Sequence, residues 1–367
     1  DRQWSRGLGD VYKRQWMTRS LGEAVASVAL EEDASVLVGG WNGTLKRWDE
    51  KGDLLWSTQL NDRINDLALG EDCIIATAGL HLVCLERKTG NVRWSHALEG
   101  SADSTVLFQD IVYAVSSVYD IEHNDFIESA VWAFALNGDS LWVNRMDERP
   151  WTMLDHQGSV WLGLGRPKCG FATIDSDGAL VYQKGGIDSP ITSGSEYDDR
   201  LLFGHANGNV STPSSETIIM RDHGIESLDC FEHGWALADE SGSVCLYDEQ
   251  GNELWCLEGD AVEAHRRGFD SNGKATHWIA RWSGVSGSLV AVDGDTGVEL
   301  ASSTDLHPRF IDVKQDRVIV GCENGDVHVW ERGVFDRRLG QKEDSMPDQK
   351  DARRTALQDK LRKLRDR

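Results

Sequence analysis

Arginine, tryptophan and histidine side chains recur at the start of apolar segments that lie far apart in the sequence. The set consists of Arg63, Arg149, Trp151, His265, Arg266, His307 and Arg309. A guanidinium pairs with a carboxylate through two parallel hydrogen bonds, and an indole ring offers a flat surface for stacking. If the fold brings these segments together, they form a basic, aromatic-edged spot that binds an acidic peptide or a small anion. The alternative is that each arginine pairs with the Asp or Glu beside it in the same segment.

Residue patterns typical of catalysis are absent from the sequence. It has no Gly-x-Ser-x-Gly motif and no His-Glu-x-x-His motif, and its 11 histidines include no pair at metal-ligand spacing. The segment Gly163–Gly170 resembles a phosphate loop only in its glycines. Asp175–Gly178 and Asp293–Gly297 lack the further ligands of a calcium loop and are expected to be turns. We therefore expect a protein that is not an enzyme and that uses neither a cofactor nor a metal.

The elements that would position these residues are short strands, as the stretch Val36–Trp56 illustrates. An apolar run is followed by Asn42-Gly43, an alternating run, a second turn at Gly52 and a closing strand that ends at Trp56. Asn-Gly between apolar runs favours a tight hairpin, because both residues tolerate positive φ. The stretch is therefore predicted to be an antiparallel meander.

The second turn of this meander recurs along the chain as a glycine followed four residues later by an aromatic residue. The copies are Gly52/Trp56, Gly90/Trp94, Gly138/Trp142, Gly178/Tyr182 and Gly251/Trp255, with Gly297/Ala301 and Gly333/Arg337 as degenerate ones. A decayed unit with its hairpin at Asn207-Gly208 fills the widest gap, which gives eight units of about 40 residues. This period predicts an all-β protein, a single β-propeller of eight four-stranded blades, or of seven if residues 185–223 form only a long loop. We expect the aromatic residues to hold neighbouring blades together.

The repeats resemble those of known propeller families. Gly39–Asp49 and Gly321–Glu331 resemble the ends of WD repeats, whereas Leu85–Trp94, Tyr247–Trp255 and Ala291–Gly297 resemble PQQ-like repeats of the quinoprotein type. The resemblance implies a propeller, but such propellers serve as scaffolds, assembly factors and dehydrogenases alike.

The dehydrogenase alternative is disfavoured by the cysteines. Dehydrogenases that use pyrroloquinoline quinone carry two adjacent cysteines, and this chain has no Cys-Cys pair. Its seven cysteines are scattered through apolar runs, and we expect them to be buried, reduced thiols in a cytoplasmic protein. No apolar run approaches the length of a membrane span, and no signal peptide is visible.

Charge is distributed unevenly along the 367 residues. The net charge is −23, but residues 1–15 carry +2 and residues 349–367 carry +5, so the part between them holds −30. Such a body is expected to repel nucleic acid, because phosphate binding needs clustered Lys and Arg. Its acidity favours solubility or adaptation to salt, with an acidic docking surface for a basic partner as the alternative.

The two ends differ in character from the repeats. Residues 1–16 are interpreted as a non-native or disordered leader, since Asp10–Gln15 resembles the translation of a sequencing adapter. Residues 17–340 form the predicted propeller, and each terminal unit is expected to own its four strands. Residues 341–367 form a charged linker and a short basic helix, with Leu357, Leu361 and Leu364 on one side.

Together these features predict a monomeric cytoplasmic scaffold that binds other proteins or acidic peptides through a propeller face and the C-terminal tail. One alternative is a small-ligand sensor or an enzyme that uses the mouth of the central channel. Another is an exported propeller of envelope assembly, if the natural N-terminus is missing from the sequence.

Overall fold

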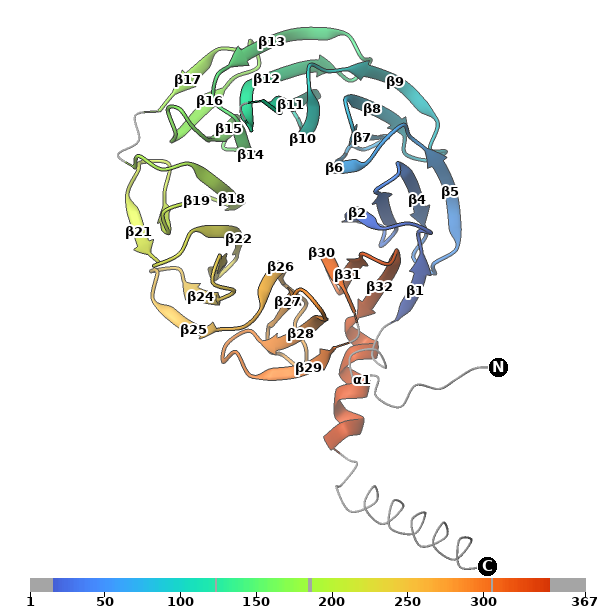
Figure 1. Cartoon of the computed structure of the whole chain (residues 1–367). Coiled ribbons are helices and arrows are strands. Elements are labelled where there is room, and N and C mark those ends of the chain that lie inside the picture. Colours follow the sequence, from blue (N-terminus) through green and yellow to red (C-terminus); the bar gives the residue numbers. More distant parts are fainter. Residues whose placement is uncertain (1–15, 123, 184–186, 305, 344–367) are drawn as a thin grey trace, which may run out of the picture.

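The computed structural model describes residues 16–122, 124–183, 187–304 and 306–343. These residues form eight four-stranded antiparallel sheets, arranged as blades around a common centre (Figure 1). The predicted eight-bladed β-propeller is therefore confirmed. The seven-bladed alternative is wrong, because the fifth unit forms a complete sheet of its own.

The blades follow one another along the chain, each with its innermost strand first. Blade 1 consists of β2 (Val25–Leu30), β3 (Val36–Gly40), β4 (Thr44–Trp48) and β5 (Leu54–Gln59), and blade 2 of β6 (Ile64–Leu69), β7 (Cys73–Ala78), β8 (His81–Glu86) and β9 (Val92–Ala97). Blade 3 consists of β10 (Ser101–Phe108), β11 (Ile111–Asp120), β12 (Asp125–Ala135) and β13 (Ser140–Met146), and blade 4 of β14 (Pro150–His156), β15 (Ser159–Leu164), β16 (Phe171–Ile174) and β17 (Leu180–Tyr182).

Blades 5 to 8 continue this order, except that the outermost strand of blade 8 is β1, which comes from the N-terminal part of the chain. Blade 5 consists of β18 (Ile191–Tyr197), β19 (Arg200–His205), β20 (Asn209–Ser211) and β21 (Thr217–Met220), and blade 6 of β22 (Ile225–Phe231), β23 (Gly234–Asp239), β24 (Val244–Asp248) and β25 (Glu253–Leu257). Blade 7 consists of β26 (Ala261–Arg267), β27 (Thr276–Trp282), β28 (Gly287–Asp293) and β29 (Glu299–Ser303), and blade 8 of β30 (Pro308–Lys314), β31 (Arg317–Cys322), β32 (Asp326–Glu331) and β1 (Met17–Ser20).

Because each blade is a meander, its loops fall on two faces of the ring. The residue before the innermost strand and the turn between the second and third strands lie on one face, which we call the front face. The turns between the first and second strands and between the third and fourth lie on the other, the back face. A register shift near the start of every innermost strand inserts one extra residue there, which is a β-bulge.

Neighbouring blades are joined at the rim by a tryptophan that packs on a turn glycine of the next blade. The pairs are Trp56 with Gly90, Trp94 with Gly138, Trp142 with Gly178 and Trp255 with Gly297. Each indole Nε1 also donates a hydrogen bond to a carbonyl of that turn over 2.8 to 3.0 Å. At Gly90 φ is 72°, and an added Cβ would lie 2.5 Å from the Trp56 ring. Only glycine therefore fits both the backbone angle and the contact.

A second joint connects innermost strands near the centre of the ring. The carboxylate of Asp66 accepts a hydrogen bond from the backbone N–H of Thr105 in the next blade, over 2.9 Å. Asp229 and Asp312 bind the next innermost strand in the same way, over 2.6 and 2.7 Å. Burial raises the pKa of all three carboxyl groups above the ordinary value.

Blade 5 departs from the rim pattern, as its sequence predicts. Its last turn contains Pro213 and Ser215 and offers no glycine to blade 4. Tyr182 of blade 4 is therefore 38% exposed, and its hydroxyl donates to the buried Glu148 over 2.9 Å. Phe171 and Phe203 stack between the two blades instead, with ring centroids 5.1 Å apart.

The ring is closed by the N-terminal strand, so the expectation that each terminal unit owns four strands is wrong. β1 pairs with β32, with Met17 opposite Val329 and Ser20 opposite Asp326. Met17 then packs against the turn glycine Gly52 of blade 1, as the tryptophans do elsewhere. This exchange cannot be recognised from the sequence, because β1 has only four residues and lacks the repeat signature.

The C-terminal residues of the last unit form a helix, α1 (Arg332–Glu343), in place of a fourth strand. Phe335 is buried, and its ring lies 5.5 Å from the rings of Phe269 and Trp278 in blade 7. The long loop that begins at Phe269 thus holds α1, and Ser271 donates a 2.5 Å hydrogen bond to Asp336. This described helix is neither long nor apolar enough to cross a membrane. The leader 1–15 and the basic helix predicted within 349–366 lie outside the described residues.

Cysteine burial is as expected for five of the seven residues, which are buried free thiols. Cys245 and Cys256 instead form a disulfide, which corrects the expectation of reduced thiols throughout. The two residues lie directly opposite each other on β24 and β25, so pairing of the strands brings their sulfur atoms together.

Replacing Trp56 with Ala should lower the free energy of unfolding by about 3 to 5 kcal/mol, because both the packing on Gly90 and the bond to Arg87 are lost. Urea unfolding followed by circular dichroism measures this change. Leu55→Ala, at a 47% exposed neighbour in β5, is the control and should change it by less than about 0.5 kcal/mol. Equal effects of the two substitutions would contradict the role given to the rim contact.

Stability should rise with pH between about pH 4 and 6.5, in part because of His328 in β32. Burial lowers the pKa of this fully buried imidazole to about 4 from its ordinary 6.5. In this window the unfolded chain therefore binds a proton that the folded chain does not, and folding weakens as the pH falls. His328→Gln should remove on the order of 2 to 3 kcal/mol of this pH-dependent gain. His233→Gln, at an exposed histidine, should leave the profile unchanged.

Candidate functional site

Three of the predicted residues occupy the same place in different blades of the front face. The backbone carbonyls of Arg63, Arg149 and His307 each accept a hydrogen bond from the turn between the second and third strands, over 2.8 to 3.0 Å. Trp151 and Arg309 share another equivalent place, the extra residue of the β-bulge in their innermost strands. The structure therefore places five of the seven predicted residues on the front face.

Arg149 and Trp151 form the core of a pocket between blades 3, 4 and 5. The Arg149 guanidinium lies 3.6 Å from the centre of the Phe126 ring and 4.1 Å from that of Trp151. It also pairs with Asp103, the bulge residue of blade 3, over 3.3 Å. Burial lowers the pKa of Arg149, although Asp103 opposes this effect. The guanidinium remains charged and is held between two aromatic rings.

The pocket beside this arginine is a cavity of about 380 Å³. Its wall combines aromatic, basic, acidic and small residues: Asp125, Phe126, Asp147, Arg149, Trp151, Arg166, Pro167, Pro190 and Thr192. Trp151 is 49% exposed at its rim. A cavity of this size admits one or two side chains of a peptide or a small ligand.

An extended hairpin, formed by the ends of β11 and β12, rises beside the pocket. Tyr119 packs edge-on against Phe126 with ring centroids 5.1 Å apart, and Phe126 contacts Trp151 in the same way at 6.0 Å. Ile121, near the tip, is 85% exposed. We call Tyr119, Ile121, Phe126 and Trp151 the hairpin patch. Tyr119, Phe126 and Trp151 are connected by ring contacts, and exposed apolar side chains gathered on one part of the surface are typical of protein interaction sites.

Arg63 and Arg309 lie near each other on another part of the front face. Arg63 stacks over the Trp41 ring at 4.0 Å, and its pKa is lowered by burial and by the charge of Arg309. Arg309 pairs with Glu263 over 3.0 Å and with Glu323 over 3.5 Å. The carboxylates that pair with Arg309 thus come from the neighbouring blade 7 and from another loop of blade 8.

The remaining predicted residues are used differently. His307 stacks on Trp282 with ring centroids 3.6 Å apart. Arg266 projects from within β26, where its nearest carboxylate is Asp229 at 3.9 Å. His265 is fully buried and lies near the end of β26, so its predicted place in a ligand-binding basic spot is wrong.

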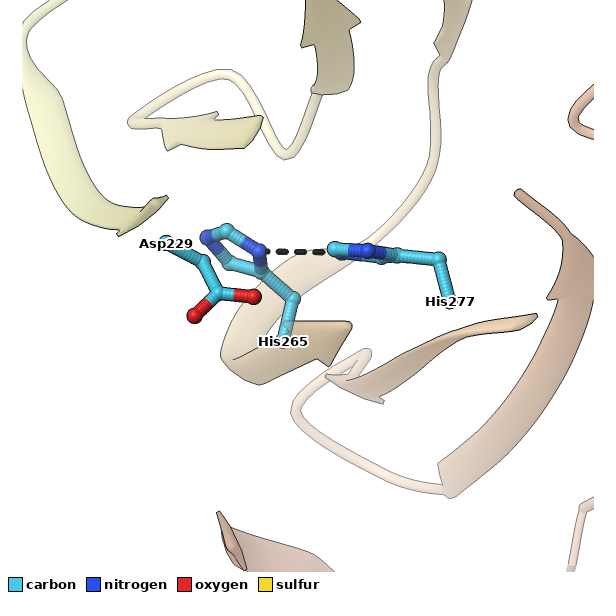
Figure 2. Close-up of side chains that lie close together, drawn as sticks. All are labelled: Asp229, His265 and His277. Carbon is cyan, nitrogen blue, oxygen red and sulfur yellow. Dashed lines mark hydrogen bonds between the residues drawn. The ribbon is translucent and has the colours of Figure 1, made fainter. Parts of the chain in front are cut away.

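His265 belongs instead to a buried cluster with Asp229 and His277 (Figure 2). His265 lies in β26 and His277 in the next strand, β27, and Nδ1 of His265 lies 3.1 Å from Nε2 of His277. Burial and the charge of Arg266 lower the pKa of His265 to about 3, while the backbone of Ser227 acts in the opposite direction. Burial and the nearby His265 hold the pKa of His277 well below its usual value. The structure therefore places side by side two histidines that their spacing in the sequence did not pair.

A second cluster suited to metal binding contains Cys245, Glu253 and Cys256. Its two sulfur atoms are joined in the disulfide and are not thiolate ligands in this state.

Sequence analysis missed the partners that complete the pocket. Phe126 lies near the start of β12, and nothing in the sequence indicates its contact with Arg149, which sits at the entrance of the next blade. Asp103 lies in no motif, and the WD-like segment that contains Trp41 does not indicate its contact with Arg63; only the arrangement of neighbouring blades reveals both contacts.

Comparisons with known proteins agree with this architecture. Residues 42–181, less than half of the chain, match the family model described as outer membrane protein assembly factor BamB. No curated protein matches the chain in sequence.

Solved structures of propellers match over most of the chain. BamB from Moraxella catarrhalis is 16% identical, with a TM-score of 0.70, and the match covers 86% of this chain and 97% of that one. Sqt1 from Saccharomyces cerevisiae is 11% identical, with a TM-score of 0.69 and coverage of 87% and 99%. The computationally designed Ika8 protein is 17% identical, with a TM-score of 0.67 and coverage of 85% and 98%. Identities this low establish the fold alone.

The chain is thus an eight-bladed β-propeller with a peptide-sized pocket on its front face. The resemblance to PQQ-like and WD repeats is confirmed at the level of this fold, by the matched segment and by the propeller neighbours.

Proposed function

We propose that this propeller is a non-enzymatic scaffold that binds another protein through the hairpin patch and the adjoining pocket. The observation that carries the proposal is the exposed apolar hairpin tip beside a pocket with an arginine held between two aromatic rings. A rigid ring holds this surface in place, and the pocket can accept an anchor side chain of the partner. The fold neighbours are consistent with such a role.

The partner segment we expect is apolar with an acidic residue. Ile121 and Tyr119 offer apolar contact, while Arg149 and Arg166 in the pocket wall attract a carboxylate. Asp125 and Asp147 lie in the same wall, so a strongly acidic segment would meet repulsion as well. We therefore narrow the expected acidic peptide to one with a single carboxylate beside apolar residues.

We place this function in the cytoplasm and assign it to a monomer. The five buried free thiols support a reducing compartment. The Cys245–Cys256 disulfide instead favours the exported alternative, because disulfides persist chiefly in oxidising compartments, and so does the match of residues 42–181 to the model of an outer membrane assembly factor.

An affinity capture from native lysate tests the proposal with three versions of the chain. The unmodified chain and Val298→Asp, a control at a 62% exposed back-face residue, should recover the same partner. The double variant Ile121→Asp, Trp151→Ala should recover it at least roughly tenfold less well, because hot-spot contacts dominate binding energy. Arg149→Ala should weaken capture and abolish competition by a peptide that carries a carboxylate.

Recovery of the same partner by the double variant, with loss in Val298→Asp, would place binding on the back face and contradict the proposal. A chain ending at Glu343 separates this site from the C-terminal tail. If the partner is lost only with the tail, the hairpin patch is not the docking surface.

A further inference from the structure

The buried His265–His277 pair lies in the interface between blades 6 and 7. Both side chains are fully buried, and Ile279 and Val292 of blade 7 pack nearby against Ala236 and Trp255 of blade 6. The Trp255 ring meets the His277 ring edge-on, with centroids 5.8 Å apart. Two imidazoles in such apolar surroundings call for a physical explanation, because buried polar groups need partners.

A hydrogen bond between the two rings does not satisfy them. Among the described residues, Nδ1 of His277 has no hydrogen-bond partner, and Nε2 of His265 has none in good geometry, although the backbone of Ser227 lies close to that ring. Whichever ring donates its proton to the other across the 3.1 Å contact, the two outer nitrogens carry one N–H and one lone pair between them, and at least one of these stays buried without a partner. The cluster is therefore incomplete as a purely hydrogen-bonded one.

The facing nitrogens are spaced as two ligands of one metal ion. Two nitrogens bound at about 2.0 to 2.1 Å to a tetrahedral ion lie roughly 3.3 Å apart, close to the observed 3.1 Å. His265, His277 and Asp229 each offer one ligand atom, and these three atoms all lie within 4.8 Å of one another. Figure 2 shows the Asp229 carboxylate beside the His265 ring and the His277 ring on its other side.

Asp229 can serve as a ligand without losing its structural bond. Its Oδ2 accepts the backbone N–H of Arg267 over 2.6 Å, and its Oδ1 lies 3.9 Å from Arg266. A carboxylate has about four acceptor positions, so a metal bond is compatible with these contacts. Because Asp229 belongs to blade 6 and both histidines belong to blade 7, an ion held by all three would join the blades.

We infer that Asp229, His265 and His277 form a binding site for a divalent transition-metal ion of the zinc class, placed as a joint between blades 6 and 7. Two imidazoles and one carboxylate are a ligand set that zinc accepts, with a fourth position left for water. The site is independent of the partner-binding role proposed above.

The surrounding charges limit which ion fits. Three guanidinium groups lie close enough to oppose positive charge on the two histidines, those of Arg266, Arg267 and Arg281. An ion held mainly by electrostatic attraction is therefore disfavoured at this place. A hard ion such as Ca²⁺ or Mg²⁺, which prefers many oxygen ligands, has only one carboxylate here. An ion that forms strong bonds to imidazole is favoured instead.

Zinc binding by the full chain tests the site directly. The protein is freed of metal with EDTA, incubated with ZnCl₂ and desalted, and bound zinc is measured by mass spectrometry. We expect about one zinc per chain and a higher midpoint of thermal unfolding, because a ligand that binds only the folded state stabilises it. No zinc retained and no shift of the midpoint would overturn the inference.

Matched variants assign the ligands. His277→Gln and Asp229→Asn should each weaken zinc binding roughly tenfold or more. Asn at 229 keeps an acceptor for the Arg267 N–H, so this variant is expected to fold. His205→Gln, at a buried histidine bonded to Ser211, is the control and should bind zinc as the unmodified chain does. Unchanged binding in His277→Gln would overturn the assignment.

Cobalt distinguishes this site from the cysteine cluster if a variant fails to fold. Co²⁺ bound to the unmodified chain should show the visible spectrum of nitrogen and oxygen ligands. Intense thiolate charge-transfer bands that disappear in Cys256→Ser would place the metal at Cys245, Glu253 and Cys256 and contradict the inference.

Discussion

The contact between an outer-strand side chain and the turn glycine of the next blade is the constraint on which the ring depends. An isolated blade cannot bury both of its faces, so the ring is stable only if every boundary is closed. Trp56 shows how one residue does this, because its ring covers Gly90 and its Nε1 binds a carbonyl of the same turn. Two residues further along β5, Thr58 donates to the carbonyl of Gly90, which fixes the angle between the blades.

The boundary between blades 4 and 5 lacks this contact, and the proposed functional surface lies along the same arc. No glycine faces Tyr182 at this boundary, and its hydroxyl donates a hydrogen bond to Glu148 instead. The core between the two blades is held by the stacking of Phe171 on Phe203. On the front face of this arc, Trp151 of blade 4 and Thr192 of blade 5 line the pocket. The repeated joints make the other blades alike. The proposed binding surface instead depends on a feature that the other blades lack, namely longer strands that form a projecting hairpin. This is the hairpin of blade 3.

The sequence predicted the blades well, because each repeat encodes its own hairpins. The spacing of Gly90 and Trp94 recurs since the turn glycine and the outer-strand tryptophan each contact a different neighbour, Trp56 on one side and Gly138 on the other. Ring closure by Met17 could not be predicted, because the pairing joins opposite ends of the chain through a strand without a signature. Here the arrangement in space, and not local propensity, decides the structure.

The site was predicted only in part for a similar reason. Arg149 and Trp151 precede or begin a recognisable strand, so their place on the front face followed from the repeat. His277 could not be paired with His265, because the long loop from Phe269 to Lys274 hides the register of the two strands. Contacts between blades, such as that of Phe126 with Arg149, depend on neighbouring repeats and leave no spacing to recognise.

Native-state hydrogen exchange, resolved by strand, tests the central claim that the tryptophan–glycine contact holds together the blade boundaries at which it occurs. Exchange in the outer strands β9 and β13, which carry Trp94 and Trp142, should require a larger opening free energy than exchange in β17, which carries Tyr182. The aromatic core in β15 and β19 should stay protected after β17 has opened. Exchange in β9 and β13 that is as fast as in β17 would contradict the account.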